Sequence, residues 1–252
     1  MKIAVITGAS SGMGREFVYH IDKNYCLDEI WVVARREDRL NQLKDECKTP
    51  IRTLPLDLLK DDSFHTYQTM LEEFRPEIQF LVNAAGFGLF GTFADMDLDT
   101  QLDSIRLNAN ALTAFCHISI PYMPKSSHII NLASNSSWQP VPYINVYGAT
   151  KAYVMSFSRA LGVELKANGI HVMAVAPGWI KTEFFDHAIH DNTITYFDRY
   201  YTAEQVIAKA MKDLNRGKSV SIMGLPVRMQ VRLIKFLPID WVMKIWCRQQ
   251  NK

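Results

Sequence analysis

The chain has 252 residues, 48% of them hydrophobic and 21% charged, which is the composition of an ordinary globular protein. Its formal net charge of +2 gives no reason to expect nucleic acid or another acidic polymer as a partner. The four cysteines are scattered and lack metal-binding spacing, so we expect no metal site. We find no signal peptide and no apolar run long enough to span a bilayer, which favours a cytoplasmic protein.

Seven short apolar runs alternate with longer amphipathic segments along the chain. We predict strands at residues 2–7, 29–34, 51–56, 78–83, 128–133, 170–176 and 219–223. These runs show little alternation of apolar and polar residues, which is typical of parallel strands that are buried on both faces. Amphipathic patterns between them predict helices, for example over residues 36–47 and after Thr202, whose capping box with Gln205 marks a helix start.

The chain has no internal repeat and no linker-like tract, so we expect one domain over residues 1–252. The regular alternation predicts an α/β fold: a single-domain, Rossmann-like, doubly wound parallel sheet of about seven strands with helices on both faces. Such sheets bind ligands beyond the carboxyl ends of their strands. Function should therefore reside in the segments that follow each strand.

A glycine-rich segment, "TGASSGMG", follows the first strand. Gly8, Gly12 and Gly14 would let the backbone turn tightly and approach a pyrophosphate, while the helix that starts there offers free N–H groups. A simple glycine-rich turn is the alternative. The position between the first strand and the first helix favours nucleotide binding.

The segments after the next strands refine this prediction. Arg35 and Arg36 follow the second strand where an acid would bind the ribose of NAD, so we predict NADP(H), with Arg35 meeting the 2′-phosphate. After the third strand, Asp57 and Leu58 either flank the adenine or, in the case of Asp57, cap the following helix. The fourth strand ends in "NAAG", whose small residues would let a planar ligand lie against the backbone.

Tyr147 and Lys151 are one helical turn apart, so their side chains leave the same helix face. A lysine ammonium beside a phenol would lower its pKa and make Tyr147 a usable acid and base. The pair alone is more typical of a solvated helix face than of a catalytic pair. Ser134, after the fifth strand, would emerge at the same edge of the sheet, and the turn from Pro177 to Thr182 could close over a nicotinamide.

Together these segments resemble the short-chain dehydrogenase/reductase family. "TGASSGMG", "NAAG", Asn108, Ser134, "YGATK" and "PGWIKT" stand in that family's order and spacing, over residues 1 to about 222. The chain is most similar to a compact, NADP-preferring, bacterial-type branch of roughly 250 residues. The resemblance implies that Tyr147 is the general acid/base, that Lys151 lowers its pKa and binds the nicotinamide ribose, that Ser134 holds the substrate carbonyl, and that Asn108 positions a water.

The resemblance also implies a set of contacts with NADP(H). These are Gly8, Ser10, Ser11, Gly12, Met13, Gly14, Arg35, Asp57, Leu58, Asn83, Ala84, Gly86, Tyr147, Lys151, Pro177, Gly178, Ile180 and Thr182. Met13 and "NAAG" are mild departures from the family pattern and remove no needed group. The serine assignment rests on spacing, and Ser136 lies two residues away.

Aromatic residues near the catalytic segments predict the kind of substrate. Residues 183–201 would form a substrate loop, and we expect substrate contacts from Phe90, Trp138, Tyr143, Phe184 and Phe185. A site lined in this way favours a bulky apolar secondary alcohol or ketone, such as a hydroxysteroid, a bile acid or a long-chain carbonyl compound. A β-ketoacyl reductase acting on a carrier-bound substrate and a non-catalytic NADP-binding regulator are the alternatives.

The last 28 residues, 225–252, form a basic amphipathic extension with six basic residues and one acid. Pro238 should divide it, and Asp240 could cap a second short helix. The extension could cover the pocket, pack on another subunit or lie on an anionic membrane, and its shortness favours the first two. The family resemblance implies a homodimer or homotetramer.

Overall fold

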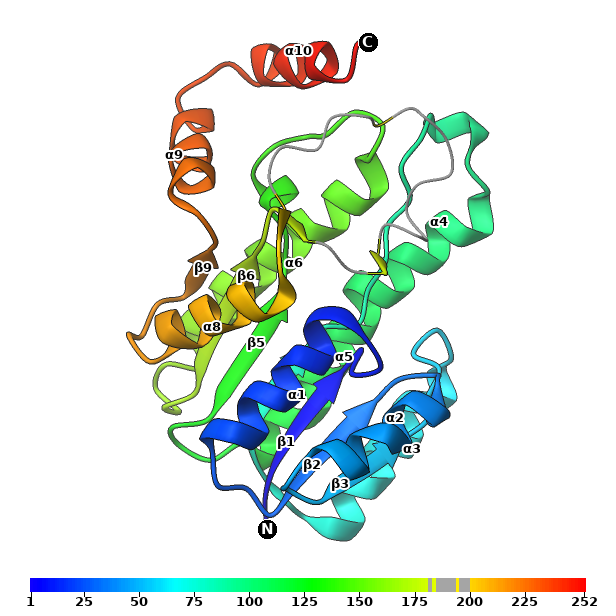
Figure 1. Ribbon diagram of the computed structural model, residues 1–252, viewed down its shortest axis with the longest axis vertical. Coiled ribbons are helices and arrows are strands. Elements are labelled where there is room, and N and C mark those ends of the chain that lie inside the picture. Colours follow the sequence, from blue (N-terminus) through cyan, green and yellow to red (C-terminus); the bar gives the residue numbers. More distant parts are fainter. Residues whose placement is uncertain (181–182, 185–193, 195–199) are drawn as a thin grey trace.

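A seven-stranded parallel sheet forms the centre of the computed structural model, which describes residues 1–180, 183–184, 194 and 200–252 (Figure 1). The strand order is β3-β2-β1-β4-β5-β6-β9. The bounds are β1 Lys2–Thr7, β2 Glu29–Val33, β3 Ile51–Leu54, β4 Glu77–Asn83, β5 His128–Leu132, β6 His171–Ala176 and β9 Val220–Ile222. The predicted α/β, doubly wound architecture is thus confirmed.

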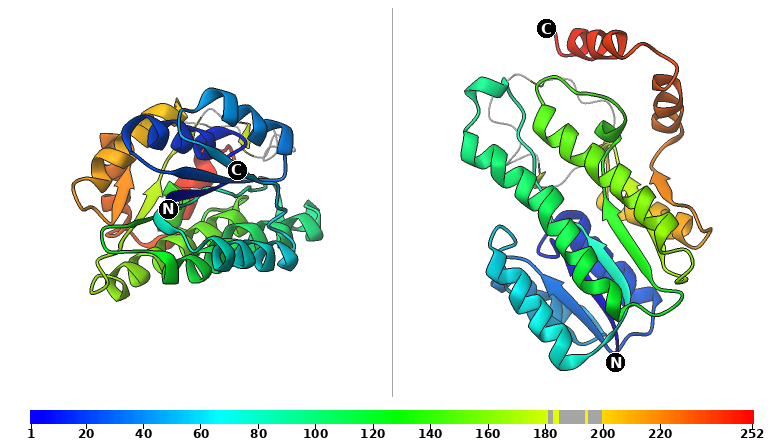
Figure 2. Two further views of the ribbon diagram at one scale, coloured as in Figure 1. Left: turned by 90° about the horizontal axis from the view of Figure 1, so that it is seen from below. Right: turned by 180° about the vertical axis from the view of Figure 1, so that it is seen from behind.

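Helices cover both faces of the sheet (Figure 2). Their bounds are α1 Gly12–Asn24, α2 Glu37–Glu46, α3 Asp61–Phe74, α4 Leu98–Ile105, α5 Leu112–Ser119, α6 Asn145–Glu164, α8 Ala203–Leu214, α9 Leu225–Ile234 and α10 Ile239–Gln249. Apolar residues of α1, α2 and α8 pack on one face of the sheet, and those of α3, α5 and α6 pack on the other. Two buried cores result, which explains why the strands are apolar on both faces.

Four strands end in register at the edge where the predicted site residues lie. Thr7 pairs with Asn83, Asn83 pairs with Asn131, and Leu132 pairs with Val175. Because the strands are parallel, the segments that follow β1, β4, β5 and β6 gather at this one edge. A short parallel pair, β7 Trp179–Ile180 and β8 Tyr200–Tyr201, lies beyond β6.

Three helix starts test the capping predictions. Thr202 caps α8 and forms the predicted capping box with Gln205. The predicted cap at Asp57 is wrong, because this side chain accepts a hydrogen bond from the amide of Leu59 within a turn and Lys60 occupies the cap position of α3. The predicted cap at Asp240 is also wrong, because Pro238 already holds the cap position of α10.

The chain after β9 forms the two helices of the extension, α9 and α10, divided at Pro238 as predicted. They extend from the carboxyl edge of the sheet to the end of the molecule opposite the N-terminus (Figure 1). Within the described residues, no helix is both long enough and apolar enough to cross a membrane.

Candidate active site

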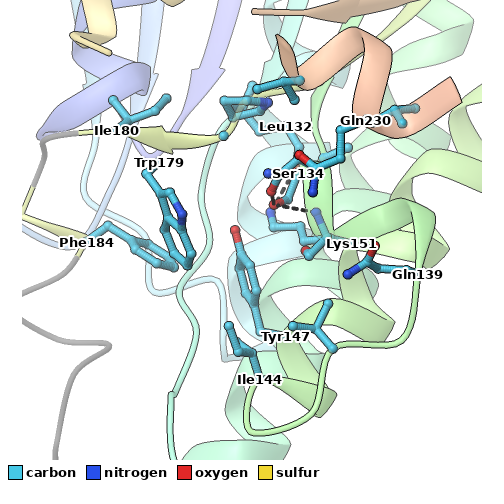
Figure 3. Close-up of a pocket in the computed structure, with 18 of the residues that line it drawn as sticks. Leu132, Ser134, Gln139, Ile144, Tyr147, Lys151, Trp179, Ile180, Phe184 and Gln230 are labelled. Carbon is cyan, nitrogen blue, oxygen red and sulfur yellow. Dashed lines mark hydrogen bonds between the residues drawn. The ribbon is translucent and has the colours of Figure 1, made fainter. Parts of the chain in front are cut away.

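Tyr147 and Lys151 lie on the first turns of α6 and face the carboxyl edge of the sheet (Figure 3). Lys151 is buried, and its Nζ donates a hydrogen bond of 2.7 Å to the carbonyl oxygen of Leu132 at the end of β5. The same Nζ lies 5.6 Å from the centroid of the Tyr147 ring. The structure thus brings the two side chains together through one helical turn and one strand end.

Ser134 follows β5 and caps the short 3-10 helix η4, Asn135–Trp138. Its Oγ accepts a hydrogen bond from the amide of Ser136 (3.2 Å), and the hydroxyl of Ser137 binds the carbonyl of Lys151 (2.7 Å). The cap therefore links Ser134 to α6 and orients its hydroxyl toward the cavity described below. Ser136 also lines this cavity, so the structure retains both serines near the site.

Asn108 lies on a π-helical turn, η2 Arg106–Ala111, between α4 and α5. Its amide nitrogen donates to the carbonyl of Phe87 (2.8 Å) and the hydroxyl of Thr150 (3.0 Å), while its Oδ1 accepts from the amide of Phe87 (3.1 Å). A Cβ atom on Gly86 would lie 2.5 Å from Asn108 Oδ1 and 3.4 Å from Lys151 Nζ. Both side chains therefore lie next to Gly86, and a side chain there would displace Asn108.

Burial shifts the pKa values of the two central residues in opposite directions. It raises the pKa of Tyr147 to about 12, although the nearby Ser134 hydroxyl acts in the opposite direction, and it lowers the pKa of Lys151 to about 8. Among the protein's own groups desolvation sets the direction of this shift, and the lowering of the Tyr147 pKa by Lys151 together with an oxidised nicotinamide stays a prediction. Near neutral pH the site holds a protonated phenol, which can donate a proton to a carbonyl oxygen.

Gly88 is a residue of this site that the sequence analysis missed. A Cβ atom at this position would lie 2.5 Å from Cδ2 and 2.7 Å from Cγ of the Tyr147 ring. Only the absence of a side chain lets the backbone pass beneath the phenol. The clustered glycines of "AGFGLFG" were the available signal, but they did not indicate which ring lies against them.

The glycine-rich loop after β1 is tightly packed. Gly8 has φ of +69° and a Cβ there would lie 2.7 Å from the amide nitrogen of Ala85, while a Cβ on Gly14 would lie 2.2 Å from the carbonyl oxygen of Gly8. Thr7 fixes the neighbouring segment by accepting hydrogen bonds from the amides of Ala84 and Ala85. The first turn of α1 contains no acid and no side-chain cap, so the loop and helix start fit a dinucleotide pyrophosphate.

Two adjacent arginines follow β2, and the structure distinguishes them. Arg36 hydrogen-bonds the hydroxyls of Ser10 (3.1 Å) and Ser11 (2.8 Å) in the glycine-rich loop, whereas Arg35 is exposed. Arg36 also pairs with Glu183 at 3.0 Å. The sequence analysis preferred Arg35 and missed the link from Arg36 to the loop. Two neighbouring arginines are equivalent in the sequence. The backbone at the start of α2 decides which of them reaches the glycine-rich loop.

Two predicted cofactor contacts are directed into the protein. Asn83 is buried, and its side-chain nitrogen binds Asn131 (2.9 Å) and Cys116 (3.3 Å) rather than facing the sheet edge. Asn131 in turn binds the hydroxyl of Ser158 on α6. Leu58 packs into the core. The Asn83 and Asn131 amides thus connect β4, β5 and α6 directly behind Lys151.

A cavity of about 360 Å³ opens at Tyr147. Predicted catalytic, cofactor and substrate residues that line it are Met13, Ala84, Gly86, Phe90, Ser134, Tyr147, Lys151, Pro177, Gly178, Ile180 and Phe184. Further apolar walls come from Val141, Ile144 and Trp179. Among the lining residues that the structure describes Lys151 is the single charged one, so this part of the cavity suits an uncharged ligand.

Two predicted substrate residues do not line this cavity. Trp138 packs against the core, with Arg159 and Lys235 placed over its ring at 5.0 and 5.2 Å. Tyr143 occupies a turn with φ of +65° that directs its ring to Lys252. Phe185, Thr182 and most of the predicted substrate loop, residues 183–201, lie outside the described residues.

The extension completes the wall of the cavity. Pro226, Val227, Gln230, Val231 and Ile234 of α9 line it, as do Trp246 and Gln249 of α10. The indole nitrogen of Trp246 donates a hydrogen bond of 3.0 Å to the carbonyl of Pro142, which fixes α10 beside α6. One face of each helix therefore belongs to the pocket.

Residues 2–193 match the family model of the short chain dehydrogenases, and the chain belongs to this family. An uncharacterised oxidoreductase of Staphylococcus epidermidis is 32% identical over 184 residues, which make up 72% of this chain and 79% of that protein. The very-long-chain 3-oxoacyl-CoA reductase of Rattus norvegicus is 31% identical over 191 residues, 71% of this chain and 60% of that protein.

Solved structures resemble the whole described fold. A short-chain dehydrogenase from Sphingobium yanoikuyae in complex with NADPH has a TM-score of 0.80 and 27% identity, covering 94% of this chain and 93% of that one. The bulky-bulky ketone specific alcohol dehydrogenase from Comamonas testosteroni has a TM-score of 0.76 and 26% identity, covering 94% and 91%.

Proposed function

We propose that the protein is an NADP(H)-dependent oxidoreductase that interconverts a secondary alcohol and a ketone on a bulky apolar substrate. The observation that carries the proposal is the cavity of about 360 Å³ at Tyr147, whose described walls include many apolar side chains and one charged residue, Lys151. A hydroxysteroid, a bile acid or a long-chain carbonyl compound would bury most of its surface there. The similarity to a dehydrogenase specific for bulky ketones supports the same substrate class.

The chain's own residues would perform the proton chemistry. Ser134 would hold the substrate oxygen, and Tyr147 would give it a proton in reduction and take one in oxidation. Lys151 would stabilise the phenolate that forms, and Asn108 would hold a water that returns the proton to the site. Bound NADPH would supply the hydride.

The cofactor would lie along the carboxyl edge of the sheet. Gly8–Gly14 and the start of α1 would hold its pyrophosphate, and the backbone of Ala84 to Gly86 would support the adenosine side. Arg35 and Arg36 would favour the 2′-phosphate, since the segment after β2 offers two guanidinium groups before its first acid, Glu37. The NADPH complex of a structural relative supports this preference.

The test is NADPH oxidation over a panel of ketosteroids, long-chain ketones and small ketones, with NADH in parallel. We expect turnover of the bulky ketones with NADPH and a loss of about 10²–10⁴-fold in Tyr147→Phe, whose NADPH affinity should be unchanged. A better rate with NADH would contradict the cofactor assignment. If NADPH raises the melting temperature while no ketone is reduced, the non-catalytic regulator and a carrier-bound substrate become the better interpretations.

A second candidate, reduction of a 3-oxoacyl thioester, is favoured by one specific observation. Arg159 and Lys235 lie over Trp138 beside the pocket, and their charges could meet the phosphates of an acyl carrier. The similarity to a 3-oxoacyl-CoA reductase agrees with it. Faster turnover of a long-chain 3-oxoacyl-CoA than of any free ketone, slowed by Arg159→Gln with Lys235→Gln, would establish this candidate instead.

We also propose that the protein forms homodimers or homotetramers in the cytoplasm. Leu98, Leu102 and Ile105 are exposed on one side of α4 at spacings of four and three residues. A second copy of this stripe would remove these side chains from water.

A further inference from the structure

The two helices of the extension carry different residues on their two sides. On α9, Val227 and Val231 are buried toward the pocket. Leu225, Met229 and Leu233 recur every fourth residue on another side and are exposed. The pocket therefore accounts for one side of α9 and leaves a second apolar side uncovered.

The same division holds on α10. Val242, Trp246 and Gln250 recur at every fourth position, and the first and last of them are buried. Trp241, which is 61% exposed, and Ile245 lie on a different side and face away from the protein. Phe236, in the turn between the helices, is 84% exposed, so exposed apolar side chains are present on both helices and in the turn that joins them.

Basic residues accompany this surface, which we call the outer face (Leu225, Met229, Leu233, Phe236, Ile239, Trp241 and Ile245), although Lys235 and Lys252 lie over the rings of Trp138 and Tyr143. Arg228, Arg232, Lys235, Lys244, Arg248 and Lys252 belong to the same 28 residues, which contain one acid, Asp240. The segment thus carries a net charge of +5, from six positive charges and one negative, while the other 224 residues carry −3.

We propose that the outer face of α9 and α10 binds the surface of an anionic lipid bilayer. Exposed tryptophan, phenylalanine and leucine side chains bordered by lysine and arginine match the boundary between acyl chains and acidic headgroups. In a symmetric contact between two copies of this face, two segments with a net charge of +5 each would lie together, and their repulsion disfavours such a contact. The proposal goes beyond the oxidoreductase activity and stands independently of it.

The placement of the helices permits this contact. They lie at the end of the molecule opposite the N-terminus and project beyond the sheet, so a flat surface can reach them (Figures 1 and 2). Since their other sides line the pocket, the bilayer would lie next to the substrate cavity. The sequence analysis preferred pocket or subunit packing for this segment; the structure accounts for the pocket side and leaves the outer face exposed.

The experiment is flotation of the full chain with phosphatidylcholine vesicles, with and without phosphatidylglycerol. We expect binding to the anionic vesicles that weakens with salt, and much weaker binding to the neutral ones. The double variant Phe236→Ser with Trp241→Ser should bind at least tenfold more weakly. Arg232→Gln with Arg248→Gln should bind about 30-fold more weakly. Each lost charge weakens binding by about 1 kcal/mol, and every 1.4 kcal/mol is about a tenfold change in affinity.

Matched controls separate this proposal from a general effect. Phe93→Ser with Val163→Ser removes two exposed apolar residues outside the extension and outside the stripe on α4, and Lys44→Gln with Lys166→Gln removes two exposed charges from elsewhere. Both controls should float as the unchanged protein does, and all variants should keep its melting temperature. Equal losses in the controls, or no binding of the unchanged protein to anionic vesicles, would overturn the proposal. So would light scattering that shows a larger assembly dissolved by Phe236→Ser with Trp241→Ser, because a second copy would then cover the outer face.

Discussion

At the scale of single residues, the site depends on groups whose protonation is set by burial. The ammonium of Lys151 keeps its proton only below a pKa of about 8, while the phenol of Tyr147 keeps its proton to about 12. Ketone reduction requires both protons in place, one to be donated and one to stabilise the resulting phenolate. In the proposed reaction, loss of the Lys151 proton would therefore set the upper pH limit for ketone reduction.

This gives a prediction for the pH profile. The kcat/KM for ketone reduction should be level near pH 7 and fall above about pH 8, as Lys151 loses its charge. Alcohol oxidation, which needs the phenolate, should show no plateau up to pH 10, because the pKa of Tyr147 is about 12. Initial rates in both directions between pH 6 and pH 10 would check it. A reductive rate that stays level to pH 10 would show that Lys151 retains its proton.

Gly88 gives a second prediction. In Gly88→Ala the new methyl group would lie 2.5 Å from the Tyr147 ring, so the phenol must move away from the substrate. We expect kcat to fall about 100-fold, a cost typical of a misplaced catalytic group, with the Kd for NADPH unchanged. Gly162→Ala is the matched control, because a Cβ there would lie at an ordinary 3.5 Å from Val172. Equal activity in the two variants would contradict the positioning role of Gly88.

The third prediction concerns Glu183, which pairs with Arg36 at 3.0 Å and Arg39 at 2.6 Å. If Arg36 helps to bind the 2′-phosphate, the Glu183 carboxylate competes for the same guanidinium. Glu183→Gln should therefore bind NADPH several-fold more tightly and NADH as before. Fluorescence titration of both cofactors would measure this. Tighter binding of both, or of neither, would place the 2′-phosphate away from Arg36.

At the scale of elements, α8 and β9 are joined by a buried carboxylate. Asp213 at the end of α8 accepts hydrogen bonds from Lys209, Lys218 (2.8 Å) and Ser221 (2.8 Å). Burial alone would raise the pKa of Asp213, but these three donors outweigh it and lower the pKa to about 2. The edge strand β9, which leads into the extension, is held to the sheet from this side.

Removal of this charge should cost stability. We expect Asp213→Asn to lose about 2–3 kcal/mol of unfolding free energy at pH 7, whereas the exposed Asp45→Asn should lose almost nothing. Because the pKa is lowered on folding, the contribution is complete above about pH 4 and disappears as the pH falls toward 2. Urea unfolding at pH 7 and pH 3 would test both statements. If the unfolding free energies of Asp213→Asn and Asp45→Asn differ by the same amount at both pH values, the linkage is contradicted.

The elements themselves could be predicted well from the sequence. All seven strands of the main sheet begin and end within two residues of the predicted bounds, because strands buried on both faces form unbroken apolar runs. Ser134, Tyr147 and Lys151 could be predicted because Ser134 follows a strand and the other two lie one helical turn apart. The roles of Arg36 and Gly88 and the inward direction of the Asn83 side chain could not be predicted from the sequence. Each depends on where the side chains of Arg36, Tyr147 and Asn83 point in the folded chain.

At the scale of the whole molecule, the exposed stripe on α4 predicts self-association. Leu98, Leu102 and Ile105 lie on one side of this helix, and we expect Leu102→Asp to convert the proposed dimer or tetramer into smaller species. A charge in a buried subunit contact costs several kcal/mol, which is more than 100-fold in the dissociation constant. Light scattering after gel filtration would measure the mass. Leu233→Asp on α9 is the control and should leave the mass unchanged.

The pocket is built from two parts of the chain that differ in their relation to the family. The catalytic floor lies within residues 2–193, which match the family model, whereas α9 and α10, which complete the wall, lie beyond that match. The proposed chemistry would therefore depend on the first stretch, and the proposed substrate would contact both. Grafting residues 225–252 onto a related dehydrogenase should thus alter one wall of the pocket while the recipient keeps its own catalytic machinery.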